Sequence, residues 1–473
     1  MKLNQLTLKQ AKEGLRKKEF SSLELTNACL EEIKRLEPKL NSFVTVTEET
    51  AIEDAKKADK AIADGVDLPL LGIPLSVKDN FSTKDVRTTA SSKVLNEYIP
   101  PFDSTVVERL KNAGMVLLGK TNMDAWAHGS STETSDFGPS KNPWDTKRLT
   151  GGSSGGSAGS VAADQTIAAI GSETAGSIRQ PASWCGVVGL KPTYGRVSRY
   201  GVIAMGSSLD SPGPITKTVE DSAVILEVLA GKDELDATTS PKPVTDYSKQ
   251  LKRDIKTLRI GISNEYFITG IDKEVEEKVK EAIKKLEEAG AKIENIKLFD
   301  PKYAIDVYTI IQRSEVSSNL ARYDGIRYGN TREYFGEEAK RRIMFGTYAL
   351  SSGYYDQYYN KAQQVRTVII DDFKKAFEKV DVIIAPTSPS LALPVGSTKD
   401  TSMFGEIADV LVEPSSIAGL SGINIPVGLS KSGLPIGMQI IAPQFGEEVV
   451  LSTAFEFESI TKGEDWRRLK PQL

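Results

Sequence analysis

Short apolar runs alternate with helix-like stretches along most of the chain, and this alternation constrains the fold more than any other feature. Helical patterns separate many of the runs, for example 104–113 and 272–290, and the second ends at Gly290, which suits a helix C-terminus. Strands that alternate with helices are typical of an α/β sheet covered on both faces. The predicted strands lie in 71–77, 115–120, 166–171, 258–263, 380–387, 423–430 and 435–443.

The chain has 473 residues, which would allow two or three domains, but we predict a single domain spanning 1–473. Residues 7–64 are expected to be helical, with Thr7 and Ser22 as helix N-caps. No internal repeat is evident. The predicted parts, in chain order, are a helical segment (1–65), a core with Ser/Gly-rich loops (66–230), a polar surface excursion (231–257) and a second part of the same fold (258–473).

Charge and composition exclude several classes of protein. The formal net charge of -4 argues against a dominant nucleic-acid-binding surface, so any RNA would be held mainly by another chain. The sequence contains no run of about 18 apolar residues, so we predict no membrane-spanning helix. The polar N-terminus lacks the apolar core of a signal peptide. Cys29 and Cys185 are too few for a disulfide framework and indicate reduced thiols in the cytoplasm.

The chain contains a single histidine, His128, and this narrows the chemistry further. A catalytic zinc site usually needs a cluster of His or Cys residues, and the sequence has none, so we predict no metal site. Acid–base chemistry must then depend on His128 or on Lys, Asp, Glu or Tyr side chains.

Residues 129–215 are crowded with Gly, Ser, Thr and Pro, a composition that is also typical of linkers. Large apolar residues such as Trp144, Trp184 and Ile170 interrupt it, and a solvated linker would not carry them. A long irregular segment inside a compact fold more often holds function. We therefore expect the functional residues in this segment.

The loop Thr150–Ala158, with the sequence TGGSSGGSA, permits three interpretations. A phosphate-binding loop requires a lysine after its glycines, and none follows here. The nucleophile elbow G-x-S-x-G is matched at Gly151–Gly155 and Gly152–Gly156, but it needs a later histidine, and His128 comes earlier. The third interpretation is a hydrolase in which a lysine activates one serine through another.

Three separated segments favour the third interpretation, because in order and spacing they resemble the amidase signature family. Ser153 and Ser177 are 24 positions apart, as the two serines of that family are. The resemblance implies the amidase signature fold, a central mixed β-sheet covered by helices on both faces. The resembling segments are the Thr150–Ala158 loop, GSETAGSIRQP (171–181) and CGVVGLKPT (185–193), together with Lys78 after its strand.

The same resemblance implies a mechanism. Ser177 would be the nucleophile, and Ser153, at an unusual cis peptide, would pass its proton on to Lys78. Lysine acts as a base only when neutral, so burial must lower its pKa from about 10.4. Taken singly, Lys78 fits a surface lysine and the serines fit turns or helix caps, but together they favour the relay. The implied oxyanion hole consists of the backbone N–H groups of Thr174, Ala175, Gly176 and Ser177.

Further stretches extend the resemblance over nearly the whole chain. They are closest to the A subunits of glutamyl-tRNA(Gln)/aspartyl-tRNA(Asn) amidotransferases. Such subunits hydrolyse glutamine and pass ammonia to a partner that holds the misacylated tRNA and activates it with ATP and Mg²⁺. The resemblance therefore implies no cofactor in this chain and a heterotrimer with B and C subunits. The stretches include GSSTETSDFGPSKNPWD (129–145), LKPTYGRVSRYGVIAMGSSLDSPGPIT (190–216) and ALSSGYYDQYY (349–359).

Glutamine as a substrate would require a guanidinium group for its α-carboxylate and a carboxylate for its α-ammonium group. Matching the family pattern places these groups at Arg342 and Asp409, and it places a pocket tyrosine at Tyr308. Arg342 and Asp409 also fit solvated positions on helices. We keep both interpretations open for these two residues.

Three departures from the family pattern lie near these positions. His128 stands where an apolar residue is more usual, Gln312-Arg313 replace small residues, and 330–340 is short. The first would alter the pocket wall or the ammonia exit. The leading hypothesis is the glutaminase subunit that serves Gln-tRNA(Gln) formation, with Asn-tRNA(Asn) left open. A stand-alone amidase of another small or acyl amide and an inactive scaffold subunit are the alternatives.

Overall fold

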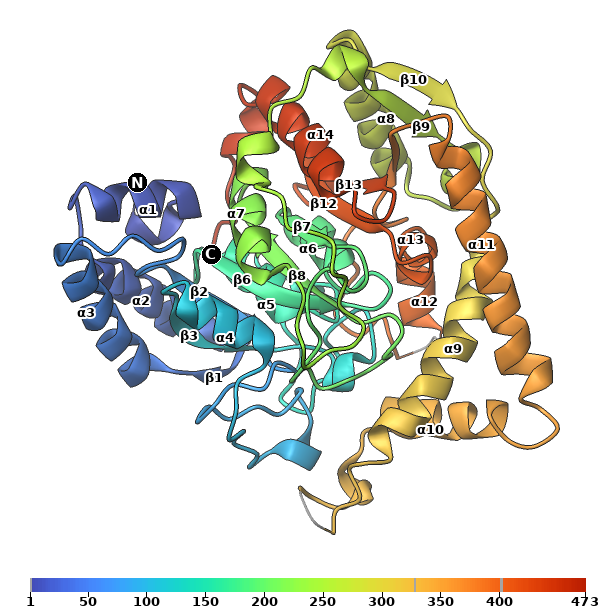
Figure 1. The fold of residues 1–473 in the computed structure, drawn as a ribbon, viewed down its shortest axis with the longest axis horizontal. Helices are drawn as coiled ribbons and strands as arrows, with labels where there is room; N and C mark the ends of the chain where they lie inside the picture. The colour runs from blue at the N-terminus through green and yellow to red at the C-terminus, as the bar shows by residue number, and fades with distance from the viewer. Residues whose placement is uncertain (1, 327–328, 400–402) are drawn as a thin grey trace.

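The computed structural model describes residues 2–326, 329–399 and 403–473. In these ranges, one sheet of 11 strands runs through the molecule and joins both halves of the sequence (Figure 1). Its spatial order is β1-β3-β2-β6-β8-β7-β12-β13-β11-β9-β10. The strands are β1 (Phe43–Val46), β2 (Pro74–Lys78), β3 (Val116–Thr121), β6 (Ala168–Glu173), β7 (Val188–Lys191), β8 (Ser211–Thr216), β9 (Arg259–Ile262), β10 (Lys292–Asn295), β11 (Val382–Pro386), β12 (Ser421–Leu429) and β13 (Pro435–Ala442), with a separate ribbon of β4 (Lys141–Asn142) and β5 (Asp145–Leu149).

Each predicted apolar run overlaps a strand of this sheet, so the α/β prediction is confirmed. The sheet is mixed, because β2 pairs in parallel with β3 and β6, whereas β6 pairs antiparallel with β8. At the other end, β9 pairs in parallel with both β10 and β11. The central mixed sheet implied by the family resemblance is therefore present.

Helices cover both faces of the sheet, as alternate strand residues show. In β6, Ala168 and Ile170 pack in the largest core cluster, which includes residues of α2, α7, α8 and α14. Ala169 points the other way and packs with residues of α5 and α6. Further along that face, Ile383 of β11 packs with residues of α9 and α11. The described helices are α1 (Leu8–Arg16), α2 (Ser22–Leu40), α3 (Glu48–Ala63), α4 (Thr105–Asn112), α5 (Gly155–Ala162), α6 (Arg179–Cys185), α7 (Val219–Leu229), α8 (Lys273–Glu288), α9 (Lys302–Leu320), α10 (Glu337–Ala349), α11 (Lys361–Phe377), α12 (Phe404–Asp409), α13 (Glu413–Ile417) and α14 (Glu447–Ile460).

The helical prediction for 7–64 holds for three helices but is wrong where they join. Strand β1 interrupts it, because Phe43–Val46 pair antiparallel with β3 at the edge of the sheet. The side chain of Thr7 caps α1 as predicted. The predicted cap Ser22 is wrong by one residue, because the Ser21 hydroxyl accepts the capping hydrogen bond and Ser22 begins the helix.

The Gly/Ser-rich centre is part of the core, so the linker interpretation is wrong. Every residue from 151 to 190 is buried except the half-buried Gly186. Strand β8 has no counterpart among the predicted strands, because Pro212 and Pro214 lack the N–H group that a central strand normally donates. It is central all the same, with β6 on one side and β7 on the other.

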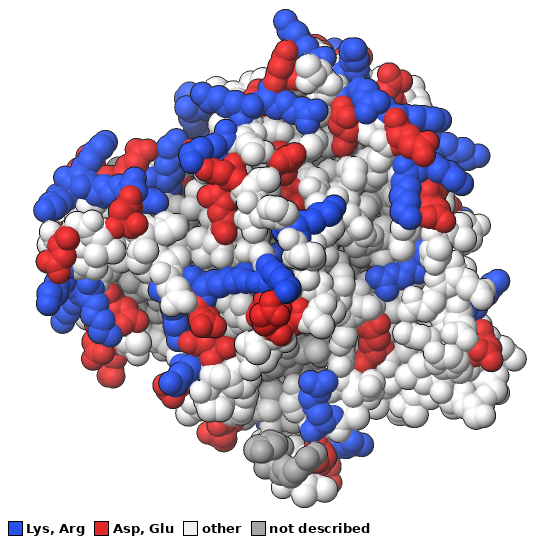
Figure 2. Space-filling model, viewed as in Figure 1, with Lys and Arg blue, Asp and Glu red and all other residues white. Residues whose placement is uncertain are grey.

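The polar stretch 231–257 is anchored to the rest of the fold. Tyr247 and Leu251 are buried, and Arg196 Nε donates to the Tyr247 hydroxyl at 2.8 Å. On the face shown in Figure 2, basic and acidic side chains are interspersed, and the lower right of this view is mostly uncharged. None of the helices in the described ranges is long and apolar enough to cross a membrane.

Candidate active site

Lys78, Ser153 and Ser177 lie close together beside the ends of the neighbouring strands β2 and β6. Lys78 is the last residue of β2, Ser153 precedes α5, and Ser177 lies in the turn between β6 and α6. Lys78 Nζ is 2.8 Å from Ser153 Oγ, and the N–H of Ser154 donates to the Ser177 carbonyl at 3.1 Å. All three predicted residues are buried, so the surface interpretation of Lys78 is wrong.

Burial changes the acid–base behaviour of Lys78. Loss of hydration lowers the pKa of Lys78 to about 7, although the carboxylates of Asp124, Asp210 and Glu173 oppose this shift. Nζ also lies 3.0 Å from the carbonyl oxygen of Ser172 and 3.1 Å from its Oγ. The carbonyl oxygen can only accept, so it fixes the direction of one lysine N–H. A substantial fraction of the amine is therefore neutral near pH 7, as a general base requires.

Close backbone packing shapes the loop that carries Ser153. The Gly152–Ser153 peptide bond is cis, as the family resemblance implies. A Cβ atom on Gly152 would lie 2.1 Å from Asp124 Oδ2, so only glycine fits there. Asp124 also accepts from the N–H of Ser131 at 3.1 Å and from Thr134 Oγ1 at 2.9 Å. Asp124 thus joins two Gly/Ser-rich loops, because its carboxylate holds Ser131 and Thr134 and its backbone N–H donates to the Ser153 carbonyl at 3.3 Å.

The predicted oxyanion residues Thr174–Ser177 form one turn, which is fixed by a buried ion pair that the sequence analysis missed. Arg179 Nη2 lies 2.6 Å from Glu173 Oε1, and neither side chain is exposed. Glu173 also accepts the backbone N–H groups of Ile178 and Arg179, each at 3.0 Å. Arg179 then reaches α13, where it donates to the Val412 carbonyl at 3.0 Å. The pair therefore holds the turn against the second half of the chain.

Tyr308 and Asp409 lie against the same turn. Tyr308 Oη is 3.3 Å from Thr174 Oγ1, and burial raises the pKa of Tyr308. A Cβ atom on Gly176 would lie 2.4 Å from Asp409 Oδ1, so the carboxylate contacts the turn directly. Ser130 Oγ donates to Asp409 Oδ2 at 2.6 Å, while Oδ1 has no hydrogen-bond partner among the described residues. Asp409 is 3% exposed, so its helix-surface interpretation is wrong, and burial raises its pKa well above the ordinary value.

Arg342 is buried as well, at 3% exposure, and not solvated. Its Nε donates to Glu338 at 2.5 Å and its Nη1 to Gln312 at 2.8 Å, while Nη2 lies 3.9 Å from Glu406. Glu406 pairs more closely with Arg313, at 2.9 Å. Gln312-Arg313, one of the departures from the family pattern, thus belongs to the network around Arg342.

Only part of this network leaves a signal in the sequence. Glu338 and Arg342 are four residues apart on α10, a spacing at which helical side chains interact. Gln312 on α9 and Glu406 on α12 are far from them in sequence, and only the fold brings them together.

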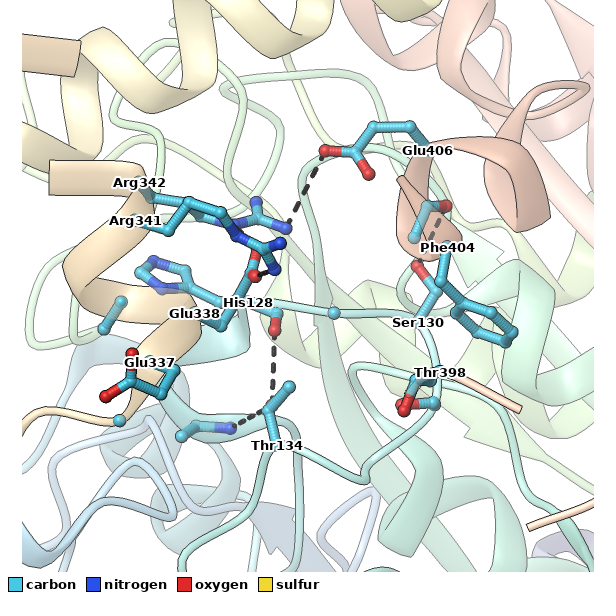
Figure 3. A pocket seen from close by; sticks show the side chains of 16 residues that line it. His128, Ser130, Thr134, Glu337, Glu338, Arg341, Arg342, Thr398, Phe404 and Glu406 are labelled. Atoms are coloured by element: carbon cyan, nitrogen blue, oxygen red, sulfur yellow. Dashed lines mark hydrogen bonds and ion pairs between the residues drawn. The ribbon is translucent and has the colours of Figure 1, made fainter. Parts of the chain in front are cut away.

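A cavity of about 280 Å³ opens beside this network (Figure 3). Its lining includes Arg342, Glu406, Ser130 and His128. Ser130 connects the cavity to the turn, because its hydroxyl holds Asp409. Pockets for drug-sized ligands begin at about 300 Å³, so this volume suits a smaller molecule such as an amino acid. Lys78, Ser153 and Ser177 are not part of this lining, so the cavity does not contain the proposed relay residues.

Cys185 and the single histidine behave differently. Cys185 is fully buried, and burial raises the pKa of its thiol. His128 is 1% exposed, and burial together with Arg342 and Arg313 lowers its pKa well below the ordinary value. Within the described ranges, no group of three His, Cys, Asp or Glu side chains is arranged to hold a metal ion.

Comparison with known proteins relates this chain to amidases and to amidotransferase subunits. The family model described as Amidase matches residues 24–451. The A subunit of the glutamyl-tRNA(Gln) amidotransferase of Thermoanaerobacter pseudethanolicus is 52% identical, covering 98% of each chain. The crystal structure of the Thermotoga maritima protein of the same name has a TM-score of 0.83 at 41% identity, covering 98% of this chain and 96% of that one. The native peptide amidase of Stenotrophomonas maltophilia has a TM-score of 0.86 at 28% identity, covering 98% of both chains.

Proposed function

The chain belongs to the amidase family, and on that premise we propose that it is the glutamine-hydrolysing subunit of a tRNA-dependent amidotransferase. The observation that carries the substrate assignment is the 52% identity, over 98% of both chains, to an A subunit of such an enzyme. The fold alone would not distinguish this function, because a peptide amidase shares it at 28% identity. The buried Lys78–Ser153 contact supports the amide-hydrolysing chemistry.

In this proposal Ser177 is the nucleophile. Its Oγ bonds to the γ-carboxamide carbon of glutamine while its proton passes to Ser153, and the Ser153 proton passes to neutral Lys78. The 2.8 Å between Lys78 and Ser153 is within reach of such a transfer. The N–H groups of Thr174, Ala175, Gly176 and Ser177 stabilise the oxyanion. When the C–N bond breaks, the proton returns through Ser153 to the leaving nitrogen, ammonia departs, and water hydrolyses the glutamyl ester on Ser177.

The α-groups of glutamine are assigned to the pocket side chains. Arg342 binds the α-carboxylate, since a guanidinium group matches a carboxylate in shape and charge. Asp409 binds the α-ammonium group through Oδ1, the oxygen that has no hydrogen-bond partner among the described residues. A bound cation favours the ionised carboxylate, so the substrate itself would counter the raised pKa of Asp409. Tyr308 forms the pocket wall beside Thr174.

The ammonia is consumed by partner chains. A B subunit holds Glu-tRNA(Gln) and activates its side-chain carboxylate with ATP and Mg²⁺, and a C subunit completes a heterotrimer in the cytoplasm. Asp-tRNA(Asn) is a further acceptor that this proposal admits. The net charge of -4 supports tRNA binding by the partner chains, because a chain that bound tRNA by itself would need a strongly basic surface.

An electrophilic glutamine analogue tests the nucleophile. The full chain is incubated with the analogue, digested and mapped by mass spectrometry. We expect one adduct on the peptide that contains Ser177 and none in the Ser177→Ala variant. An unmodified Ser177 peptide would support the inactive scaffold in place of a glutaminase.

Reconstitution tests the choice between the two enzymatic functions. Glutaminase activity is measured for the chain alone and after addition of co-purified subunits, charged tRNA and ATP. We expect activity to rise in the complete mixture. Good turnover of varied amides by the chain alone, with no gain from the other components, would instead identify a stand-alone amidase, the function that the peptide amidase likeness favours.

A further inference from the structure

The imidazole of His128 is a buried polar group without a protein partner. It is 1% exposed, and neither Nδ1 nor Nε2 has a hydrogen-bond partner among the described residues. Buried polar side chains are nearly always hydrogen-bonded, because an unsatisfied one is destabilising. The ring therefore requires an explanation that the fold does not supply.

The ring lines the cavity that also contains Arg342 and Ser130. Figure 3 shows it on the side of the cavity where α10 carries Arg342. The charges of Arg342 and Arg313 both act on the imidazole. His128 is therefore placed next to the group to which we assign the α-carboxylate of the substrate.

The backbone fixes the ring in this position. Trp126 and Ala127 have φ angles of 59° and 63°, which non-glycine residues seldom adopt. The His128 N–H donates to the Ala125 carbonyl at 3.0 Å, and the His128 carbonyl accepts from Thr134 Oγ1 at 3.2 Å. The imidazole is presented to the cavity by a tight turn and two backbone hydrogen bonds.

The surroundings also determine what the ring can offer. Burial and the two guanidinium groups keep the pKa of His128 low, so the imidazole is neutral and carries one N–H donor. On Arg342, Nε and Nη1 are held by Glu338 and Gln312, whereas among the described residues Nη2 has only the 3.9 Å approach of Glu406. Nη2 and the imidazole N–H are thus two buried donors that can bind a carboxylate in this cavity. The lining also includes the more exposed Arg341, which pairs with Glu338.

We propose that His128 donates a hydrogen bond to the α-carboxylate of the substrate beside Arg342 and selects amides that carry a free α-carboxylate. The inference rests on the proposed function and deepens it. Two donors from different side chains can bind the two oxygens of one carboxylate, and such charge-assisted bonds are the stronger kind. An apolar residue at this position would remove the donor that lies beside the Arg342 guanidinium group.

The test pairs a variant with a substrate that lacks the recognised group. His128→Met removes the donor and keeps a side chain of similar length. We expect kcat/KM for glutamine to fall about tenfold, mainly through KM, because a hydrogen bond to a charged group is lost. For 4-aminobutanamide, which is glutamine without its α-carboxylate, the change should stay below about twofold. Equal losses on both substrates, or no loss on glutamine, would overturn the proposal.

Conservative variants separate hydrogen bonding from packing. The amide nitrogen of Asn can replace Nδ1 and that of Gln can replace Nε2, so His128→Asn or His128→Gln should recover most of the glutamine activity. The variant that does so identifies the donating nitrogen. If both behave like His128→Met, the ring acts through its shape and the proposal fails.

A binding measurement gives a readout without turnover. Because His128 is the only histidine in the chain, ring C–H signals of the labelled, untagged Ser177→Ala protein need no assignment. Glutamine should shift these NMR signals more than 4-aminobutanamide does, and equal shifts contradict the proposal. Wild-type glutaminase activity of the complex is measured first. Its absence overturns the proposed function, whereas normal activity with an unaffected His128→Met variant overturns only this inference.

Discussion

The relay region and the pocket region meet at the candidate site but are built in different ways. The relay region (Lys78, Ser153 and the turn 174–177) lies on the ends of central strands, and glycines and backbone hydrogen bonds shape its loops. The pocket region (Arg342, Asp409 and their neighbours) lies on α9, α10 and α12, where side-chain hydrogen bonds and ion pairs hold it.

This difference separates chemistry from recognition. The proposed relay needs fixed distances between reacting groups, and strand ends and close backbone contacts hold Lys78 Nζ 2.8 Å from Ser153 Oγ. The pocket needs charges that match a substrate, and side chains on helices can be exchanged there without reshaping the sheet. Arg179 joins the two regions, because it pairs with Glu173 on β6 and donates to the Val412 carbonyl beside α13. Four perturbations test this description.

Removing the proposed base should have the largest effect of the four changes, because the relay region then lacks its proton acceptor. In Lys78→Ala, no neutral amine remains to take the proton from Ser153, and we expect glutaminase kcat to fall by about 10⁴-fold. Steady-state kinetics of the complex provide the measurement, with Lys84→Ala, which truncates an exposed lysine in the same way, as the control. Near-full activity in Lys78→Ala would refute the relay.

The second-largest effect should come from removing the Glu173–Arg179 ion pair, which connects the two regions. This effect should be a loss of stability. Arg179→Met leaves Glu173 as an uncompensated buried charge, which costs about 3–5 kcal/mol. Denaturant unfolding measures the change in the free energy of unfolding. In the matched control Arg259→Met, the side chain that pairs with Asp381 is 42% exposed, so the loss should stay below about 1 kcal/mol. If both variants lose the same free energy of unfolding, Arg179 stabilises the protein no more than a surface ion pair does, and its role in connecting the two regions is refuted.

A change in the pocket should affect substrate binding more than the chemical step. Arg342→Met removes the proposed carboxylate ligand, and we expect KM for glutamine to rise about 100-fold with a smaller change in kcat. Lys340→Ala removes the same charge from the same helix at a 43% exposed side chain and serves as the control. A variant that lowers kcat while KM stays constant would place Arg342 with the relay.

The smallest expected effect is the change of kcat with pH, and it should depend on the relay region alone. The active form of Lys78 is neutral and its pKa is lowered to about 7, so activity should increase as pH rises through 7. Below pH 7 the neutral fraction, and with it kcat, should fall about tenfold per pH unit. The pH profile of kcat in Arg342→Met should keep the same midpoint. A midpoint that moves with the pocket variant would mean that the two regions titrate together.

Much of the fold could be predicted from sequence because its signals are local. The apolar runs that became β2, β3, β6, β9, β11, β12 and β13 are short and bounded, as buried strands are. Strand β8 could not be predicted, since Pro212 and Pro214 argue against a central strand unless both neighbours are known. Strand β1 could not be predicted within the helical stretch 7–64, because only its pairing with β3 makes it a strand.

The sequence by itself determined the α/β class, because the short apolar runs of buried strands are local properties of the chain. It supplied the candidate relay through the family resemblance of the segments around Ser153 and Ser177. The tertiary structure alone decided the burial that lowers the pKa of Lys78, the Glu173–Arg179 pair and the side chains around Arg342. It also decided that His128, an isolated departure in the sequence, faces a cavity beside a guanidinium group. Burial and long-range pairing depend on which distant segments pack together, and no local pattern encodes that.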